Sequence, residues 1–409
     1  MSSVNIMEKL LDGVAVEWVT LGSVADIGTG SSNRQDESEN GTYPFYVRSK
    51  KILKSDIFEF NEVAIIIPGE GGIGEIFHYV EGKYALHQRA YRIHVKSDVV
   101  STKFLFHFMS SRFKQYILTK SVGATASSIR KPMLEEFQIP IPCPGTPNKS
   151  LEIQAEIVRI LDAFSERTTE VKAELTAELT TRKKQYEHYR DELMNFKDGE
   201  VEWKALGEIG EFIRGKRFTK ADFVEDGISA IHYGEIYTRY GAFTTQAFSQ
   251  VRNEMAGSLR YAEPGDVVIT DVGETVEDVG KAVAWLGDEK VAIHDHCYAF
   301  RHSMDPRFVS YCMNTSSFVA DKAKYIARTK VNTLLINGFS KIKIPVPFPA
   351  DPERSLAEQV RIVSILDRFD ALTNSLAELF PREIALHQKH YEHYRDLLLN
   401  FPRLEKVVA

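Results

Sequence analysis

The sequence predicts an α+β fold, with two α/β domains separated by two long antiparallel coiled-coil-like helices and related by an internal pseudo-twofold repeat. Repetition is the first observation behind this prediction. The hexapeptide YEHYRD occurs at 186–191 and again at 391–396, an offset of 205 residues. A period of this length indicates domain duplication, because the units of solenoid proteins are far shorter. The chain is therefore two copies of one module.

Two further observations support the duplication. The segment 154–162 returns at the same offset as 359–367, and VEWVTLG near the N-terminus returns as VEWKALG at the start of the second half. Between these repeats the halves share little sequence, so a common frame carries two different variable regions. We expect four parts: a first domain at 1–149, a central helix at 150–197, a second domain at 198–349 and a C-terminal helix at 350–409.

The repeated segments predict the two helices. Ser150 and Ser355 each follow a proline-rich stretch, and Ser355 with Glu358 matches a capping box. Apolar residues then recur at spacings of three, four and seven, which is typical of coiled-coil stripes. About 45 residues of helix would reach about 68 Å. We expect the two helices to pack on each other, with Pro381 as a kink or break; the alternative is that each packs only on its own domain.

The variable regions contain more strand than helix. Short β-branched or alternating runs bounded by Gly, Pro or Asp predict strands at 63–68, 75–80, 91–95, 266–270 and 281–286. Helices are expected at 104–118 and 308–327, and each region ends in a strand-like QIPIP or KIPVP. These patterns predict α+β domains with surface loops.

Composition narrows the class of protein. No apolar run approaches the roughly 20 residues of a membrane span, and the N-terminus lacks the basic and apolar regions of a signal peptide, so we expect a cytoplasmic protein. Three cysteines indicate no disulfide framework. The net charge is −6, but 150–200 holds 12 Asp/Glu against 8 Lys/Arg. The acid excess therefore falls on the predicted helix and does not exclude nucleic-acid binding by the domains.

The order of these features resembles the specificity subunit of Type I restriction–modification systems over essentially the whole chain. The shared layout is a variable region, an IPIP-type end, a helix with Q-x-E-I-V-x-I-L-D at 154–162, a second variable region and a repeated helix. AELTAEL at 173–179 is also similar to the short TAEL repeat in the central helix of the IC-like branch. The second helix departs from it at 377–381, which leaves open whether both helices contribute equally to spacing.

The resemblance implies a non-catalytic subunit with two target-recognition domains. Each would read one half of a bipartite double-stranded DNA target, and the helices would set the spacer and dock two modification subunits. With restriction subunits, the assembled complex would be a DNA adenine methyltransferase and an ATP-dependent restriction endonuclease. S-adenosylmethionine, ATP and magnesium are expected on these partners and none in this chain. No association with membranes is expected.

Motifs for such chemistry are missing from the sequence. Neither a DPPY- or NPPF-like loop nor GxxxxGK[ST] occurs. GEGGIG at 69–74 is a formal GxGxxG, but the segment after it alternates like a strand, so we expect a glycine-rich hairpin turn and not a dinucleotide site. The string HDHC at 294–297 could offer metal ligands. Its strand-like context would place His294 and His296 on one face and Cys297 on the other, so we expect core or loop-supporting residues and no metal site.

Candidate DNA contacts are polar and basic side chains that recur at matching places in the two halves. Arg and Lys suit phosphates and guanine, and Asn suits adenine. In the first half they are Asn33, Arg34, Arg48, Lys50, Lys51, Lys54, Arg130 and Lys131. In the second they are Arg214, Lys216, Arg217, Lys220, Arg239, Arg328, Lys330 and Asn332. Any one of them alone is more easily a solvated surface charge, so the recurrence of the groups is what indicates a binding face.

Two other classes of function remain as alternatives. A protein–protein scaffold without sequence-specific DNA binding would explain the helices and their acidic charge, but not two divergent regions bearing Arg and Lys. A self-contained DNA-modifying enzyme would need the motifs that the sequence lacks.

Overall fold

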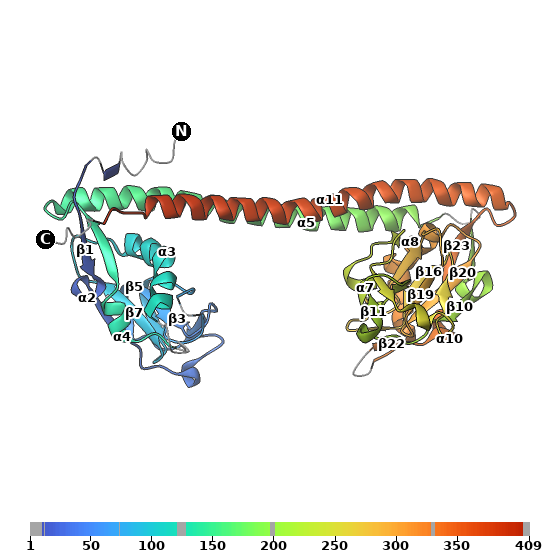
Figure 1. The fold of residues 1–409 in the computed structure, drawn as a ribbon, viewed down its shortest axis with the longest axis horizontal. Helices are drawn as coiled ribbons and strands as arrows, with labels where there is room; N and C mark the ends of the chain where they lie inside the picture. The colour runs from blue at the N-terminus through green and yellow to red at the C-terminus, as the bar shows by residue number, and fades with distance from the viewer. Residues whose placement is uncertain are drawn as a thin grey trace. The chain divides into compact units, whose positions relative to one another are not determined.

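The computed structural model describes residues 10–403 except 12, 73, 121–127, 197–200 and 329–331. The chain forms two compact units, one of residues 1–175 with 381–409 and one of residues 176–380. Each unit contains one α/β domain and parts of two long helices, α5 (Pro147–Leu193) and α11 (Pro352–Leu398) (Figure 1). The predicted fold class, with its duplicated domain, is confirmed.

The first domain, residues 16–142, contains a six-stranded sheet in the order β2-β7-β5-β6-β3-β4. Successive residues of the central strand enter different cores: Ile65 and Ile67 pack with the helix α3, whereas Ile66 packs with Tyr84 on the other face. The strand predicted at 63–68 and the helix predicted at 104–118 are thereby confirmed. The elements are β1 (Val16–Thr20), α2 (Leu21–Val24), β2 (Ala25–Thr29), η1 (Arg34–Asp36), β3 (Tyr43–Tyr46), β4 (Leu53–Ser55), β5 (Phe60–Pro68), β6 (His78–Leu86), β7 (Ala90–Val95), α3 (Thr102–Lys120), α4 (Lys131–Glu135) and β8 (Gln138–Pro142).

The second domain, residues 201–347, has a corresponding sheet in the order β10-β20-β16-β18-β13 and another in the order β11-β14-β12-β19-β15. Its elements up to β16 are β9 (Val201–Ala205), α6 (Leu206–Ile209), β10 (Gly210–Arg214), η2 (Lys220–Asp222), β11 (Phe223–Val224), β12 (Ile228–Ile231), α7 (Tyr233–Thr238), β13 (Phe243–Thr244), β14 (Ser249–Val251), η3 (Asn253–Met255), β15 (Tyr261–Ala262) and β16 (Val267–Thr270). The rest are β17 (Val272–Gly273), β18 (Ala282–Trp285), β19 (Val291–Ile293), β20 (Cys297–His302), α8 (Pro306–Met313), α9 (Ser316–Lys322), η4 (Ala323–Tyr325), β21 (Ile326–Ala327), β22 (Asn332–Leu334), α10 (Ile336–Phe339) and β23 (Lys343–Pro347).

One predicted helix of the second domain is wrong as a single element. The segment 308–327 contains most of α8, then α9, the 3-10 turn η4 and the short strand β21. The interruption falls at Thr315, whose side chain accepts a hydrogen bond from the backbone N–H of Phe318 and so caps α9. A threonine that bonds to the following backbone favours a new helix start over continuation of the old one.

The repeated VEW and IPIP segments pair with each other in both domains. β1 runs antiparallel to β8, with Trp18 opposite Pro140, and β9 runs antiparallel to β23, with Trp203 opposite Pro345. The two-stranded ribbon joins the first and last strands of each domain next to a long helix. It explains why these two short segments return together in the sequence.

Both long helices begin one turn before the predicted serines. Pro147 and Pro352 are their first residues, as expected for proline at the first helical position. Ser150 and Ser355 are buried inside the helices, where their hydroxyls accept hydrogen bonds from the side-chain amides four residues on. The predicted capping box at Ser355 is therefore wrong, and Glu358 instead pairs with Arg361 at 2.7 Å.

Proline does not break the second helix. Pro381 lies inside α11, which is continuous over 47 residues. A proline removes one hydrogen bond from the helical ladder and leaves the bonds of the neighbouring turns in place. Of the kink or break predicted at this position, the break is wrong and the kink stays a prediction.

Each long helix contributes both to a domain core and to a helix–helix contact. Ile157 and Leu161 of α5 belong to the core of the first domain, and Ile362 and Leu366 of α11 belong to that of the second. Within each unit, aromatic rings of α5 and α11 also stack on each other. The expected pairing of the two helices is confirmed. Each helix also packs on an α/β domain.

Candidate nucleic-acid interface

Each domain carries a tight turn built around a histidine. Between β6 and β7, His87 Nδ1 accepts a hydrogen bond from the backbone N–H of Arg89 at 3.0 Å. Between β19 and β20, His294 Nδ1 accepts from the backbone N–H of His296 at 3.1 Å. We call residues 87–89 and 294–296 the histidine turns. They occupy the same place in the two domains.

The second histidine turn overturns a prediction. The string 294–297 was expected to lie within one strand, but β19 ends at Ile293 and β20 begins at Cys297. The ring of His294 binds a backbone N–H that a strand would offer to its neighbour, which favours a turn over an extended chain. The two flanking strands accordingly belong to different sheets.

The central strand of each sheet ends beside a histidine turn. After β5, the N–H of Gly69 donates to the carbonyl of Arg89 at 2.8 Å. After β16, the N–H of Asp271 donates to the carbonyl of His296 at 3.0 Å. An acidic residue lies close to this strand end in both domains: Glu70, one residue after Gly69, in the first and Asp271 itself in the second.

The polar loops that follow β2 and β10 reach the same place because of two glycines. A Cβ added at Gly30 would collide with the carbonyl of Leu86, and one at Gly215 would collide with the carbonyls of Ile293 and His294. Only glycine permits so close a backbone approach. The polar loop, the strand end and the histidine turn therefore meet in each domain.

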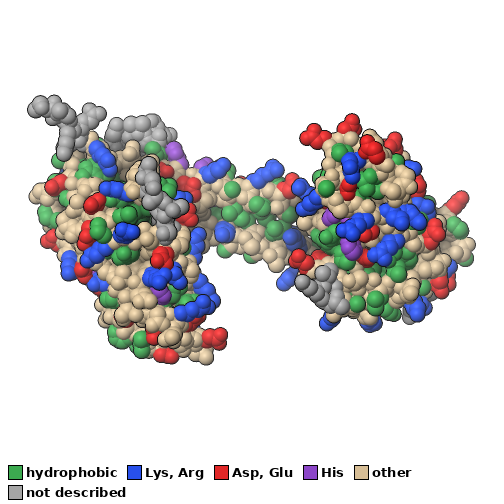
Figure 2. All heavy atoms as spheres, turned by 60° about the horizontal axis from the view of Figure 1, so that its bottom comes forward, with side chains coloured by type: hydrophobic (Ala, Val, Ile, Leu, Met, Phe, Trp, Pro, Cys, Tyr) green, Lys and Arg blue, Asp and Glu red, His purple; other side chains and the backbone are tan. Residues whose placement is uncertain are grey.

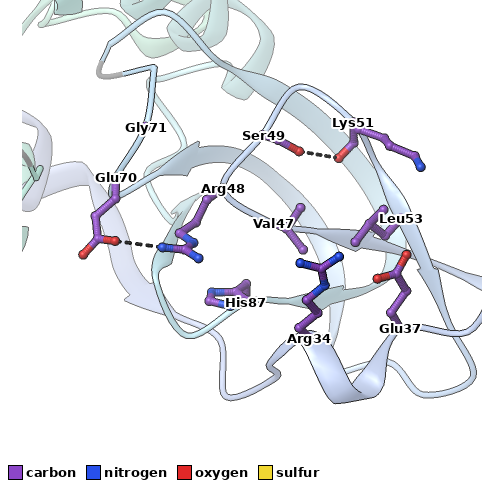
Figure 3. A pocket seen from close by; sticks show the side chains of 10 residues that line it. All are labelled: Arg34, Glu37, Val47, Arg48, Ser49, Lys51, Leu53, Glu70, Gly71 and His87. Atoms are coloured by element: carbon purple, nitrogen blue, oxygen red, sulfur yellow. Dashed lines mark hydrogen bonds and ion pairs between the residues drawn. The ribbon is translucent and has the colours of Figure 1, made fainter. Parts of the chain in front are cut away.

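In the first domain these elements enclose a hollow of about 520 Å³ (Figure 3). Arg48 Nη1 and Arg89 Nη1 both donate to Glu70 Oε2, at 3.0 and 3.1 Å. These hydrogen bonds, that from Arg89 first, lower the pKa of Glu70. Burial lowers the pKa of His87, so its ring is neutral at pH 7. The hollow is lined by Arg34, Glu37, Val47, Arg48, Ser49, Lys51, Leu53, Glu70, Gly71 and His87.

In the second domain a buried carboxylate holds two donors at the corresponding strand end. Asp271 accepts from Arg214 Nη2 at 3.2 Å and from His296 Nδ1 at 2.9 Å. The Arg214 side chain is 57% exposed, whereas that of Asp271 is 5% exposed. Burial lowers the pKa of the neighbouring His294 to about 4. Among the residues that the structure describes, no group of three His, Cys, Asp or Glu side chains is arranged to hold a metal ion.

The comparisons with known proteins agree in pointing to one family. A profile of the Type I restriction modification DNA specificity domain matches residues 14–181 and 199–385. The specificity subunit of the type I restriction enzyme EcoR124I/EcoR124II from Escherichia coli is 31% identical over all of both chains. A putative type I restriction enzyme specificity subunit from Haemophilus influenzae is 29% identical, over 97% of this chain and 98% of that one.

This chain belongs to the Type I restriction–modification DNA specificity family. Its function is DNA target recognition, and the two matched ranges each cover one α/β domain. Two solved structures share the fold. One, from work on complex assembly and conformational transition of the type I system, has a TM-score of 0.65 at 17% identity, over 94% of this chain and 97% of that chain. The other, the HsdS subunit from Thermoanaerobacter tengcongensis, has 0.53 at 17%, over 94% and 96%.

The structure gathers three of the predicted contacts of this specificity subunit in the hollow: Arg34, Arg48 and Lys51. Asn33 has a local role, because its side-chain oxygen accepts from the N–H of Gln35 at 2.9 Å and caps η1. The other predicted side chains of this domain are exposed and lie outside the lining of the hollow: Lys50, Lys54, Arg130 and Lys131.

In the second domain of the specificity subunit, Arg214 lies at the strand end with Asp271. Arg239 lies over the ring of Phe248 at 5.6 Å, and Asn332 donates to the carbonyl of Glu274 at 2.9 Å. The remaining predicted side chains that the structure describes are exposed: Lys216, Arg217, Lys220 and Arg328. Lys330 lies outside the described residues. Figure 2 shows Lys and Arg side chains interspersed with acidic ones on both domains.

Four residues of the two sites were missed: Glu70, Arg89, Asp271 and His296. The sequence signal for the two carboxylates is an acidic residue within two positions of the end of the central apolar strand, in VAIIIPGE and in DVVITD. The predicted glycine-rich turn at 69–74 does connect the antiparallel strands β5 and β6, although Ile73 lies outside the described residues. No described helix is long and apolar enough to cross a membrane.

Proposed function

We propose that this specificity subunit reads a bipartite double-stranded DNA target, one half with each α/β domain. The observation that carries the proposal is the pair of histidine turns, each beside an arginine held by a carboxylate at the same strand end. Equivalent placement in both domains suits one shared task. Different surrounding side chains suit different base sequences, since bases are read by a few side chains in the groove.

The long helices suit the role of a spacer between the half-sites. α5 and α11 have 47 residues each, which corresponds to about 70 Å of helix. Within each unit the two helices are joined by stacked aromatic rings and share a core with the domain. Such packing opposes bending, so the length of the unspecified gap would follow from the length of the helices.

We further propose that the chain is non-catalytic and acts in the cytoplasm with two modification subunits and with restriction subunits. S-adenosylmethionine, ATP and magnesium would bind to those partners. The absence of the corresponding motifs from the sequence supports this division of labour. Exposed apolar side chains along α11, among them Leu372 at 58% and Leu379 at 52%, suit a protein-docking face.

Co-expression with the modification subunit of the same system, followed by single-molecule sequencing of methylated adenines, tests the proposal. We expect a bipartite motif with a fixed gap, found only when this chain is present. Replacing residues 17–142 by the corresponding region of a relative should change one half-site and leave the other. Methylation without two separated half-sites would favour a scaffold role, and methyl transfer by the purified chain alone would contradict the non-catalytic assignment.

A further inference from the structure

The arginine–carboxylate pairs of the two domains are built from different positions in the fold. His87 donates its backbone N–H to Tyr46 O, and His294 donates its own to Ile231 O, so Arg48 in the first domain corresponds to Tyr233 in the second. Arg214 ends β10, whereas no arginine occurs in β2. Arginines at two different positions in the fold therefore place a guanidinium at the end of the central strand. Duplication alone does not explain this, because it would have repeated the arginine at one position.

Stability of the fold does not explain the first pair either. The side chains of Arg48 and Glu70 are 47% and 38% exposed, and ion pairs with this exposure contribute little to stability. A carboxylate does, however, hold an arginine in one orientation. The remaining N–H groups then meet a ligand with less loss of side-chain entropy, and their geometry suits two parallel hydrogen bonds.

Hydrogen-bond donors converge on the hollow of the first domain (Figure 3). His87 Nδ1 accepts a backbone N–H, so the proton of the neutral ring is on Nε2. Arg34 and Arg48 supply further donors, while one oxygen of Glu70 already accepts from two arginines. In the major groove guanine presents two acceptors, O6 and N7, whereas adenine and cytosine each present an amino donor. The lining also contains Glu37, whose carboxylate accepts hydrogen bonds, but the Arg, Lys and His side chains of the lining outnumber its two carboxylates. The hollow therefore offers mainly donors and matches guanine.

We propose that Arg48 reads a guanine in the half-site of the first domain and that Arg214 reads a guanine in the half-site of the second. Glu70 and Asp271 are positioning residues that hold the two guanidiniums in the reading orientation. The proposal rests on the proposed function and adds to it the reading residues and the base that they select.

The test is to map methylation motifs with the assembled methyltransferase, wild type and variants. Arg48→Ala should relax one base pair, a G·C pair in the wild-type motif, in one half-site only. Arg214→Ala should do the same in the other half-site. Loss of one bidentate contact should reduce the preference for guanine roughly 5- to 150-fold. Glu70→Gln should relax the same base pair as Arg48→Ala, to a smaller extent.

A matched control is Arg301→Lys. Arg301 also donates to a buried carboxylate, that of Asp266, at 3.1 and 2.8 Å, but this pair lies at the start of β16 and Asp271 follows its end. The variant should leave the motif unchanged. If Arg48→Ala abolishes methylation, the Arg48→Lys variant is used instead. The Kd values of this variant for DNA with guanine and with each other base at that position give the preference for guanine as a ratio.

Three results would overturn the proposal: an unchanged motif with Arg48→Ala, relaxation at an A·T pair, or a uniform loss of affinity with a salt slope reduced by about one, which indicates a phosphate contact. The wild-type motif separates this failure from that of the proposed function. If the wild type shows no bipartite motif, the function itself is refuted. If it does, only the assignment of the bases fails.

Discussion

The ring of Phe164 on α5 stacks on the ring of Tyr394 on α11, with 4.9 Å between centroids and 17° between planes. In the other unit Phe369 stacks on Tyr189, at 5.4 Å and 18°. The two phenylalanines are 205 residues apart in the sequence, and so are the two tyrosines. Each contact thus pairs the same two repeat positions with the helices exchanged, as in an isologous dimer interface. Part of the YEHYRD repeat is therefore a helix-pairing motif.

We expect the Phe164–Tyr394 stack to contribute a measurable coupling energy. In a double-mutant cycle of Phe164→Ala and Tyr394→Ala, the combined loss of unfolding free energy should fall short of the sum of the single losses. The difference should be about 0.5–1.5 kcal/mol, as for other aromatic pairs. Urea unfolding of the full chain measures it. Phe164→Ala with Tyr189→Ala is the control and should be additive, because these residues are 25 positions apart on α5.

Gln154→Ala should loosen the first domain from α5. Its buried amide accepts from the N–H of Ser101 at 2.8 Å and donates to Val99 O at 2.7 Å. Removing it leaves two partly buried backbone groups without these partners, at a cost of about 1–3 kcal/mol. Hydrogen exchange at the amide of Ser101 should become faster. Glu152→Ala, on the exposed side of the same turn, should leave exchange unchanged, and equal exchange in both variants would contradict the docking role.

Acid should destabilise the second domain before its carboxylates titrate. Burial lowers the pKa of His302 to about 4, against an ordinary value of 6.5, and its Nε2 has no hydrogen-bond partner in the described structure. Below pH 6.5 the unfolded chain binds the proton more readily, so stability is fully present above that pH and falls as the pH drops toward 4. His302→Asn, which keeps an acceptor for the N–H of Met304, should flatten this part of a pH series of urea midpoints. An unchanged slope would refute the assignment.

Lengthening the central helix should widen the gap between half-sites. Inserting Thr-Ala-Glu-Leu after Leu179 adds about 6 Å of helix, which corresponds to one or two base pairs at about 3.4 Å each. Mapped methylation should show a longer spacer and unchanged half-sites. An altered half-site with an unaltered spacer would refute the role of the helix as a spacer.

Local patterns were sufficient for the elements with strong periodicity or repetition. The apolar run at 63–68 became β5, and the stripes around Leu161 and Leu366 became the buried faces of α5 and α11. Local reasoning failed where one side chain redirects the backbone. Thr315 starts a new helix, and His294 turns the chain between two sheets. In both cases a hydrogen bond between side chain and backbone overrides the propensity of the surrounding segment.

The sequence alone determined the duplication, the two long helices and the family, because these depend on repeats and motifs that are linear in the chain. The tertiary structure alone decided which charges meet. Arg48 and Glu70 are 22 residues apart and Arg214 and Asp271 are 57 apart, and no periodicity links such positions. Their pairing follows from the register of the sheet. This register brings the end of the central strand, the loop that passes close to the backbone at Gly30 or Gly215, and the histidine turn together. The sequence therefore predicted candidate basic residues, and the pairing of the strands showed which of them lie together in a site.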